Sequence, residues 1–208
     1  MWFSKNNHSS ITFIKIKGLK KEEKEHYFEA GLWEDAQRIE GNTFTGRLVK
    51  ISPDQYEFEG NMRNTIKFLF VDNNHEHFQL DISYNSLSRS LLNSLLGFID
   101  TRKENWITQW CIEVELSLYI NKENYKQMGV KVNGERAKWR WDIEAQKAMI
   151  ETITKKNGTK ENDYFEYDEK LKSCIPEIQA YIEVTDFAKE EVKEEKQSDP
   201  ISIDDVPF

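Results

Sequence analysis

The chain has 208 residues and a formal net charge of −8, which is enough length for one sizeable domain with additions. Its two cysteines, Cys111 and Cys174, argue against a disulfide scaffold and against a cysteine zinc cluster. We find no signal peptide and no apolar run of membrane-spanning length, so we expect a cytoplasmic protein with no membrane partner.

The negative charge is concentrated in one part of the chain. Residues 183–208 carry nine acidic side chains and three lysines, a net charge of −6 that leaves −2 for the rest. Residues 118–141 instead carry six cations and two acids, a local net charge of +4. The total charge therefore does not exclude a polyanion as partner, and the acidic segment could compete for the site where it binds.

The first part of the chain is the least informative. Residues 11–17 are β-branched and partly alternating, which predicts a strand. Residues 19–30 are highly charged and predict a helix that ends at Gly31. We expect residues 1–40 to form an extension that packs on a core domain formed by residues 41–182.

Three strands are expected next. Residues 43–51 predict the first strand, and the turn signal at 52–55 is followed by further extended chain up to Gly60. An apolar, β-rich run at 65–71 predicts the second strand. Residues 77–84 alternate between apolar and polar side chains and predict the third.

A helix and two more strands follow. Leucines recur at helical spacing within residues 87–99, which indicates an amphipathic helix. Residues 112–120 and 128–132 alternate and predict strands. Asn133-Gly134 is a strong hairpin signal, and we expect the chain to return as a strand over residues 136–141.

Strand, strand, strand, helix, strand, strand is the order of an OB-fold, a five-stranded Greek-key barrel with a helix between its third and fourth strands. We therefore predict a mainly β fold with added helices, built on such a barrel. A β-sandwich or an SH3-like barrel would explain the strands but not the helix. Residues 142–156 predict a further helix, and residues 164–184 predict short helical pieces whose position the sequence does not fix.

Proteins that bind single strands combine cations for phosphates with aromatic faces for bases. In an OB-fold this surface covers strands two and three and is framed by the loops that join strands one to two and four to five. The sequence places aromatic and cationic residues in both loops: Tyr56, Phe58, Arg63, and Lys122, Tyr125, Lys126. Further candidates are two residues on outward strand faces and the cations and tryptophan of the basic hairpin: Lys67, Tyr119, Lys131, Arg136, Lys138, Trp139, Arg140.

Several of these features have a simpler interpretation. Phe68, Phe70, Phe78 and Tyr84 are expected in the core rather than under bases. Alternation in the return strand places its cations on one side, which could face phosphates or could be a solvated edge.

Support for catalysis is weak. His75 and His77 lie near Asp72, so a metal site is conceivable, but an exposed loop explains them better. We find no phosphate-cradling glycine loop, no nucleophile elbow and no paired cysteine motif. We therefore predict a protein that is not an enzyme and has no cofactor.

Residues 183–208 are rich in Glu, Asp and Lys and poor in large apolar side chains, which predicts a disordered acidic tail. The tail closes with Asp204-Asp205-Val206-Pro207-Phe208. A terminal Phe ring can fill an apolar pocket while its α-carboxylate meets a basic rim. Pro207 lowers the ordering cost of docking, and the two aspartates steer the tip toward a positive patch. We expect these five residues to bind partner proteins.

This tip resembles the C-terminal tip of bacterial single-stranded DNA-binding proteins, which end in several Asp, an apolar residue, Pro and Phe. Phage-encoded proteins with the same role also commonly end in an acidic tail with a terminal Phe. The resemblance covers five residues. It implies binding to single-stranded DNA with little sequence preference, and recruitment of replication, recombination and repair proteins by the tip, which could also cover the DNA groove.

The segments outside residues 43–141 do not match a compact bacterial core followed by a long linker. The phage type is therefore favoured, which implies the cytoplasm of a bacterial host and leaves the oligomeric state open. The main alternative is an RNA-binding or protein-interaction OB-fold module whose acidic tail only solubilises it. A weaker alternative is a phage enzyme of nucleotide metabolism with an unrecognised site.

Overall fold

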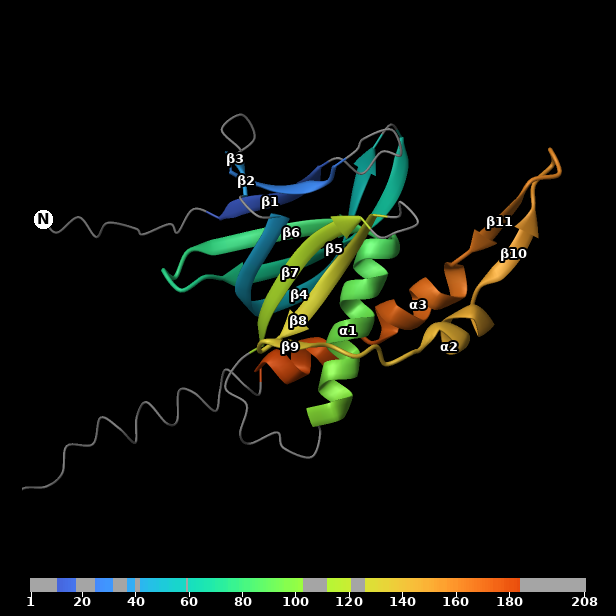
Figure 1. Ribbon diagram of the computed structural model, residues 1–208. Coiled ribbons are helices and arrows are strands. Elements are labelled where there is room, and N and C mark those ends of the chain that lie inside the picture. Colours follow the sequence, from blue (N-terminus) through green and yellow to red (C-terminus); the bar gives the residue numbers. More distant parts are fainter. Residues whose placement is uncertain are drawn as a thin grey trace, which may run out of the picture.

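The computed structural model describes residues 11–17, 25–31, 37–39, 42–58, 60–102, 112–120 and 126–183. Within them the chain forms a large mixed sheet, a separate hairpin and several helices (Figure 1). The elements are β1 Thr12–Lys17, β2 Tyr27–Gly31, β3 Gln37–Arg38, β4 Thr43–Phe58, β5 Asn61–Val71, β6 His77–Ser83, α1 Ser86–Arg102, β7 Glu113–Ile120, β8 Lys126–Val132, β9 Glu135–Arg136, α2 Ile143–Ala148, β10 Glu151–Thr154, β11 Lys160–Asp163 and α3 Phe165–Ser173. Residues 175–183 are also helical.

The large sheet has the strand order β3-β2-β1-β6-β5-β4-β7-β8-β9. Strands β4, β5 and β6 form an antiparallel meander, and β7 pairs with both β4 and β8. The predicted series of three strands, a helix and two strands is therefore present. The mainly β fold with added helices is confirmed.

The predicted closure into a barrel is not confirmed. In the described part of the chain β6 pairs on its outer side with β1, in parallel, and not with β8. The edge that closure would use is thus occupied by the predicted N-terminal extension. The expected helix over residues 19–30 is wrong at β2, because Tyr27–Gly31 pairs with β1 and buries Phe28 completely. Burial in a sheet here outweighs local helix propensity.

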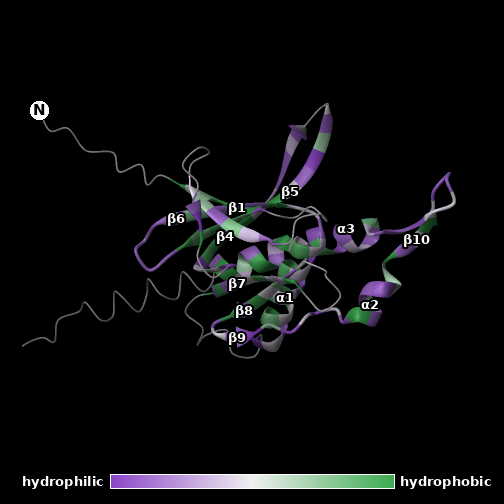
Figure 2. Ribbon diagram, turned by 45° about the horizontal axis from the view of Figure 1, so that its top comes forward, coloured by the Kyte–Doolittle hydropathy of each residue, from purple (hydrophilic) through white to green (hydrophobic). Residues whose placement is uncertain are grey.

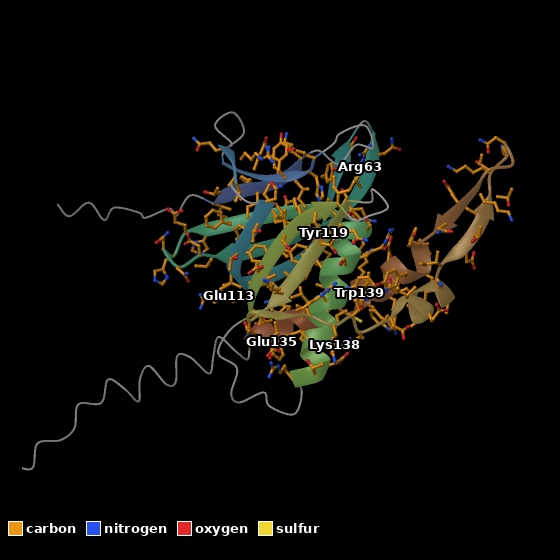
Figure 3. All side chains as sticks on the ribbon, in the orientation of Figure 1. Arg63, Glu113, Tyr119, Glu135, Lys138 and Trp139 are labelled. Carbon is orange, nitrogen blue, oxygen red and sulfur yellow. The ribbon has the colours of Figure 1, made fainter. Side chains whose placement is uncertain are left out.

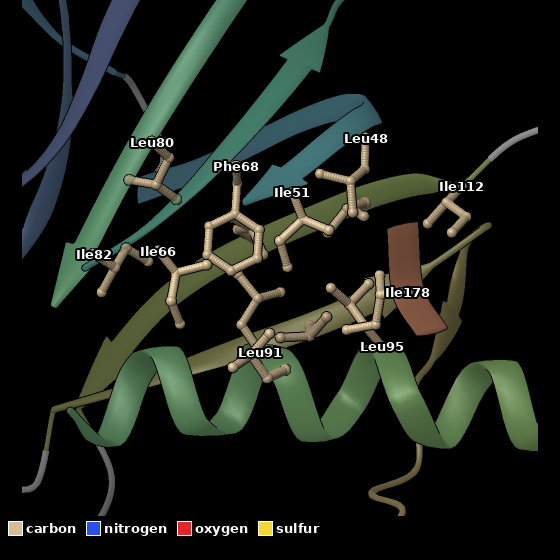
Figure 4. Close-up of a cluster of buried hydrophobic side chains, with 14 of the residues drawn as sticks. Leu48, Ile51, Ile66, Phe68, Leu80, Ile82, Leu91, Leu95, Ile112 and Ile178 are labelled. Atoms are coloured by element: carbon tan, nitrogen blue, oxygen red, sulfur yellow. The ribbon is translucent and has the colours of Figure 1, made fainter. Parts of the chain in front are cut away.

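The hydrophobic core lies between this sheet and α1 (Figure 4). Leu91 and Leu95 of α1 point toward Phe68, Ile66 and Ile51 of the sheet, and all five side chains are buried. The predicted core aromatics lie here: Phe68 and Phe70 are fully buried, and Phe78 and Tyr84 are partly buried and pack against the core cluster.

The start of α1 is fixed by reciprocal capping. The Oδ1 atom of Asn85 accepts hydrogen bonds from the N–H groups of Leu87 and Ser88, and the Oγ atom of Ser88 accepts one from the N–H of Asn85. These contacts satisfy backbone donors that a helix start leaves open. The face of α1 that meets the sheet is therefore set by both its leucine spacing and its cap.

Beyond the core, the expected helix over residues 142–156 is wrong in its second half. Helix α2 ends at Ala148, and Glu151–Thr154 forms β10, which pairs with β11. The β-branched run Thr152-Ile153-Thr154 favours a strand, and Gly158, with a φ of 80°, permits the turn. The β10–β11 hairpin projects from the body (Figure 1).

Among the described residues, no helix is both long enough and apolar enough to cross a lipid bilayer.

Candidate nucleic-acid interface

The β4–β5 hairpin extends beyond the rest of the sheet. Strand β6 pairs with β5 only from Thr65 to Val71, so the hairpin past Thr65 is a two-stranded ribbon (Figure 1). On this ribbon Tyr56 lies directly opposite Arg63, and both side chains are exposed, Tyr56 by 40%. An aromatic face and a guanidinium are thus neighbours on one side of the ribbon, which is the combination that stacked bases and phosphates require.

Tyr119 on β7 supplies a second exposed aromatic ring. Its side chain is 42% exposed and faces away from the core, since Leu118 and Leu116 alternate with it on the buried side. A Cβ on Gly129 would lie 2.8 Å from Ser117 Oγ and 3.4 Å from Tyr119 Cε1, so the glycine avoids a close contact with Ser117 next to the ring. Figure 3 shows Tyr119 and Arg63 toward one end of the sheet and Glu113 toward the other.

A hollow of about 200 Å³ lies beside Tyr119. Strand β7 contributes Leu118, Tyr119 and Ile120, and the opposite wall consists of residues that precede or form the first part of the sheet: Glu25, His26, Arg38 and Asn42. Reasoning from the sequence alone missed these four wall residues. No local pattern signalled them, because they reach β7 through the tertiary structure.

Arg38, in the wall of this hollow, contacts two neighbouring side chains. The Nη2 atom of Arg38 lies 3.2 Å from Glu25 Oε2, and its guanidinium carbon lies 4.4 Å from the centre of the Tyr27 ring. The Arg38 and Glu25 side chains are both more than half exposed, and such ion pairs contribute little. The His26 ring is buried, with Nε2 3.2 Å from the carbonyl oxygen of Gln127 on β8. This contact connects the residue just before β2 with β8.

Lys67 lies among acids rather than in an open basic patch. Its Nζ atom is 2.7 Å from Asp54 Oδ2 on β4, and its direct neighbour on β6 is Asp81. The hydrogen bond to Asp54 raises the pKa of Lys67, and the same bond lowers the pKa of Asp54. Two carboxylates around one ammonium leave this position without net positive charge, so it does not favour a phosphate.

The segment after β9 differs from its prediction. The return strand expected over residues 136–141 stops at Arg136, and the chain then crosses α1 in extended form. The Asn93 side chain on α1 holds it there: Nδ2 donates to the Trp141 carbonyl at 2.8 Å, and Oδ1 accepts from the Trp141 N–H at 2.9 Å. A Cβ on Gly97 would lie 2.0 Å from the Lys138 carbonyl oxygen, so this crossing requires glycine.

Arg140 is a structural residue in this segment. Its guanidinium donates to Asp100 of α1 and to Glu177 of the 175–183 helix, each at 2.7 Å, and its side chain is 15% exposed. The hydrogen bond to Glu177 is the chief cause that raises the pKa of Arg140. The guanidinium joins three segments, and its donors are used by carboxylates of the protein itself.

The other hairpin candidates lie apart from the ribbon. Lys131 Nζ is 2.7 Å from Glu115 Oε1, and its neighbour across β9 is the exposed Arg136. Lys138 is exposed and Trp139 is 44% exposed; in Figure 3 they lie along α1, at a distance from Arg63. The predicted residues thus divide into one group at the ribbon end of the sheet and one along α1.

Some predicted residues cannot be placed. Lys122, Tyr125 and Asp204–Phe208 lie outside the described residues. Phe58 and Lys126 are described by their backbone, opposite Asn61 and Ile120 respectively, and their side chains are not.

The turn with the two histidines is stabilised by Asp72. Its Oδ1 atom accepts hydrogen bonds from the N–H groups of Asn74 and Glu76, each at 2.9 Å. In the described part of the chain, no group of His, Cys, Asp and Glu side chains could hold a metal ion.

No family model matches this chain, and no curated protein and no solved structure matches it.

Proposed function

We propose that this protein binds single-stranded DNA with little sequence preference, through an OB-fold formed by β4, β5, β6, β7 and β8. The observation that carries the proposal is the strand order β6-β5-β4-β7-β8 with α1 inserted between β6 and β7. In an OB-fold the third, second, first, fourth and fifth strands follow in this order, and such barrels can be partly open. Here β1 takes the place beside β6.

The position of exposed rings and cations supports a nucleic-acid ligand. In an OB-fold the hairpins between strands one and two and between strands four and five frame the binding face. The first of these is the β4–β5 ribbon with Tyr56 and Arg63, and the second joins β7 to β8 next to Tyr119. Stacking contributes about 1–3 kcal/mol per base without reading sequence, and cations add a salt-dependent term.

The binding surface we propose is narrower than the one expected from the sequence. We assign contacts to Tyr56, Arg63 and Tyr119, and we keep the role predicted from the sequence for Lys122, Tyr125 and Lys126. We exclude Arg140, because its guanidinium binds Asp100 and Glu177, and we give no role to Lys67 between its aspartates. A ligand at the ribbon end then avoids the acids at the centre of the sheet.

A titration with labelled oligonucleotides tests the proposal. Fluorescein-labelled oligo(dT), oligo(U) and duplex DNA are titrated with the full chain at low salt, and fluorescence anisotropy gives each Kd. We expect oligo(dT) to bind far more tightly than duplex, with affinity that falls steeply as salt rises. Tighter binding of oligo(U) would support the RNA-binding alternative, and no binding to any of the three would refute the proposal.

We propose a second role, recruitment of replication, recombination and repair proteins, for Asp204–Phe208. It rests on the resemblance of these five residues to the tips of single-stranded DNA-binding proteins, which also favours the cytoplasm of a bacterial host. Deletion of Phe208 should abolish partner binding and leave oligo(dT) affinity unchanged or slightly higher, because we assign Phe208 to partner proteins and not to the DNA surface. A large loss of affinity would show that the tip has been assigned the wrong role.

A further inference from the structure

The arm formed by α2, β10 and β11 has little support from the rest of the protein. Every residue of β10 is exposed, as are Lys160, Glu161 and Asn162 of β11. Within the described residues these two strands pair only with each other. An isolated two-stranded hairpin is marginally stable in water, so an arm of this kind is more readily explained by a contact with a partner than by folding alone.

Large apolar side chains are exposed along the same arm. Ile143 of α2 is 59% exposed, Ile153 of β10 is 40% exposed, and Phe165, where α3 begins, is 69% exposed. Figure 2 shows hydrophobic residues on α2 and near β10, outside the body of the molecule. Single exposed apolar residues are common, but two on this small arm and a third where α3 begins at its root indicate an interaction surface.

The root of the arm encloses a hollow of about 350 Å³. Its lining combines two apolar side chains with four acids: Met149, Phe165, Glu151, Asp163, Glu166 and Glu169. The hollow lies where β10 begins, β11 ends and α3 starts, so all three elements contribute to it.

The four acids form two pairs of like charge, and Asp163 Oδ1 also accepts a hydrogen bond from the Phe165 N–H at 2.9 Å. Glu151 and Asp163 lie directly opposite each other across β10 and β11, an arrangement of like charges that destabilises a hairpin. Glu166 and Glu169 are three residues apart in α3 and share a face of the helix. Lys172 contacts Glu169 at 3.1 Å, which offsets one charge of the four. A cationic partner would relieve this repulsion.

We propose that this root is a docking site for a protein segment in which a large apolar side chain is flanked by lysine or arginine. The apolar side chain would cover Phe165 and Met149, and the flanking cations would face Glu151, Asp163 and Glu166. Nucleic acid does not fit, because its phosphates would meet the same carboxylates. The site lies on other elements than Tyr56, Arg63 and Tyr119 and does not depend on DNA binding.

The test uses a defined peptide. A fluorescein-labelled peptide of sequence Gly-Ser-Arg-Lys-Leu-Phe-Lys-Arg-Ser-Gly is titrated with the full chain at low salt, and anisotropy gives its Kd. Two matched peptides carry Glu in place of each cation, or Ser in place of Leu and Phe. We expect the parent peptide to bind at least about tenfold more tightly than either, since both features of the hollow are needed.

Variants of the protein locate the binding. Phe165→Ser and the double variant Glu151→Gln with Glu166→Gln should each weaken the parent peptide about tenfold, because they remove an exposed anchor or two charges. The matched controls Ile11→Ser and Glu76→Gln change exposed residues elsewhere and should not alter the Kd. The acidic tail is the same in all variants, so unspecific binding of the peptide to the tail contributes equally to each and does not affect the comparison between them. Bound peptide should slow amide hydrogen exchange within residues 149–169.

Four results would overturn the proposal. They are unchanged binding in both the Phe165→Ser and the double variant, equal binding of all three peptides, displacement of the peptide by oligo(dT), and concentration-dependent dimerisation of the wild type that Phe165→Ser abolishes. The third would make the hollow part of a nucleic-acid surface, and the fourth would make a second copy of the chain its occupant. Because Phe165 is exposed, thermal unfolding of its Ser variant should match the wild type.

Discussion

The β4–β5 ribbon and the segment that crosses α1 look alike in the sequence and differ in the fold. Each offers aromatic rings beside cations: Tyr56 with Arg63 in the first, Trp139 and Trp141 with Arg140 in the second. The ribbon keeps Tyr56 and Arg63 side by side and exposed, whereas Arg140 is held by Asp100 and Glu177 and the Trp141 ring packs edge-on against Tyr167. The same pattern of rings and cations therefore lies at the surface in one region and is partly used for contacts within the protein in the other.

The largest expected effect is on stability, at Arg140. Arg140→Ala removes the guanidinium that Asp100 and Glu177 share, and because both carboxylates are at least one-third exposed we expect a loss of about 2–3 kcal/mol of unfolding free energy, less than for a fully buried pair. Urea unfolding followed by circular dichroism measures the cost, with the exposed Arg136→Ala as the matched control, expected to change stability by less than about 0.5 kcal/mol. Equal effects of the two variants would contradict the difference between the regions.

Gly97→Ala tests the same region from the side of α1. The added Cβ would meet the Lys138 carbonyl oxygen at 2.0 Å, so the crossing segment must shift, at a cost of about 2 kcal/mol. Ser86→Ala, at an exposed position at the start of the same helix, serves as the control. If thermal unfolding showed no loss for Gly97→Ala, the contact between this segment and α1 would be in doubt.

The ribbon should affect binding and leave stability unchanged. Tyr56→Ala removes one stacking surface, which should cost about 1.4 kcal/mol of binding free energy. The affinity for oligo(dT) should therefore fall about tenfold. Phe165→Ser removes an exposed ring of similar size on the arm and should leave oligo(dT) affinity unchanged. The reverse result, loss with Phe165→Ser and none with Tyr56→Ala, would move the DNA surface to the arm.

The smallest expected effect separates two cations of β5. Arg63→Gln should reduce the slope of log K against log salt by about 0.9, the value for one phosphate contact of a duplex, or somewhat less for a single strand. Lys67→Gln should leave that slope unchanged, because Asp54 and Asp81 already offset its charge. Equal slopes for both variants would show that Asp54 and Asp81 do not prevent Lys67 from contacting a phosphate.

The sequence by itself determined the elements whose pattern is local. Alternation predicted β6, β7 and β8, an apolar β-rich run predicted β5, and leucine spacing predicted α1. Phe68 and Phe70 were predicted in the core, where both are fully buried. Side chains two residues apart in a strand, or three and four apart in a helix, share a face whatever the rest of the chain does, so these patterns can be recognised without a structure.

Only the tertiary structure decided which segments meet. The parallel pairing of β1 with β6 joins residues more than sixty positions apart and leaves the sheet open, and Arg140 reaches Asp100 and Glu177 over forty and thirty-seven positions. The sequence predicted a helix over residues 142–156, whereas residues 151–154 form a strand because they pair with β11. Burial and charge pairing between distant segments produce no periodic pattern in the sequence, and here they determine both which strand lies beside β6 and which cations have carboxylate partners.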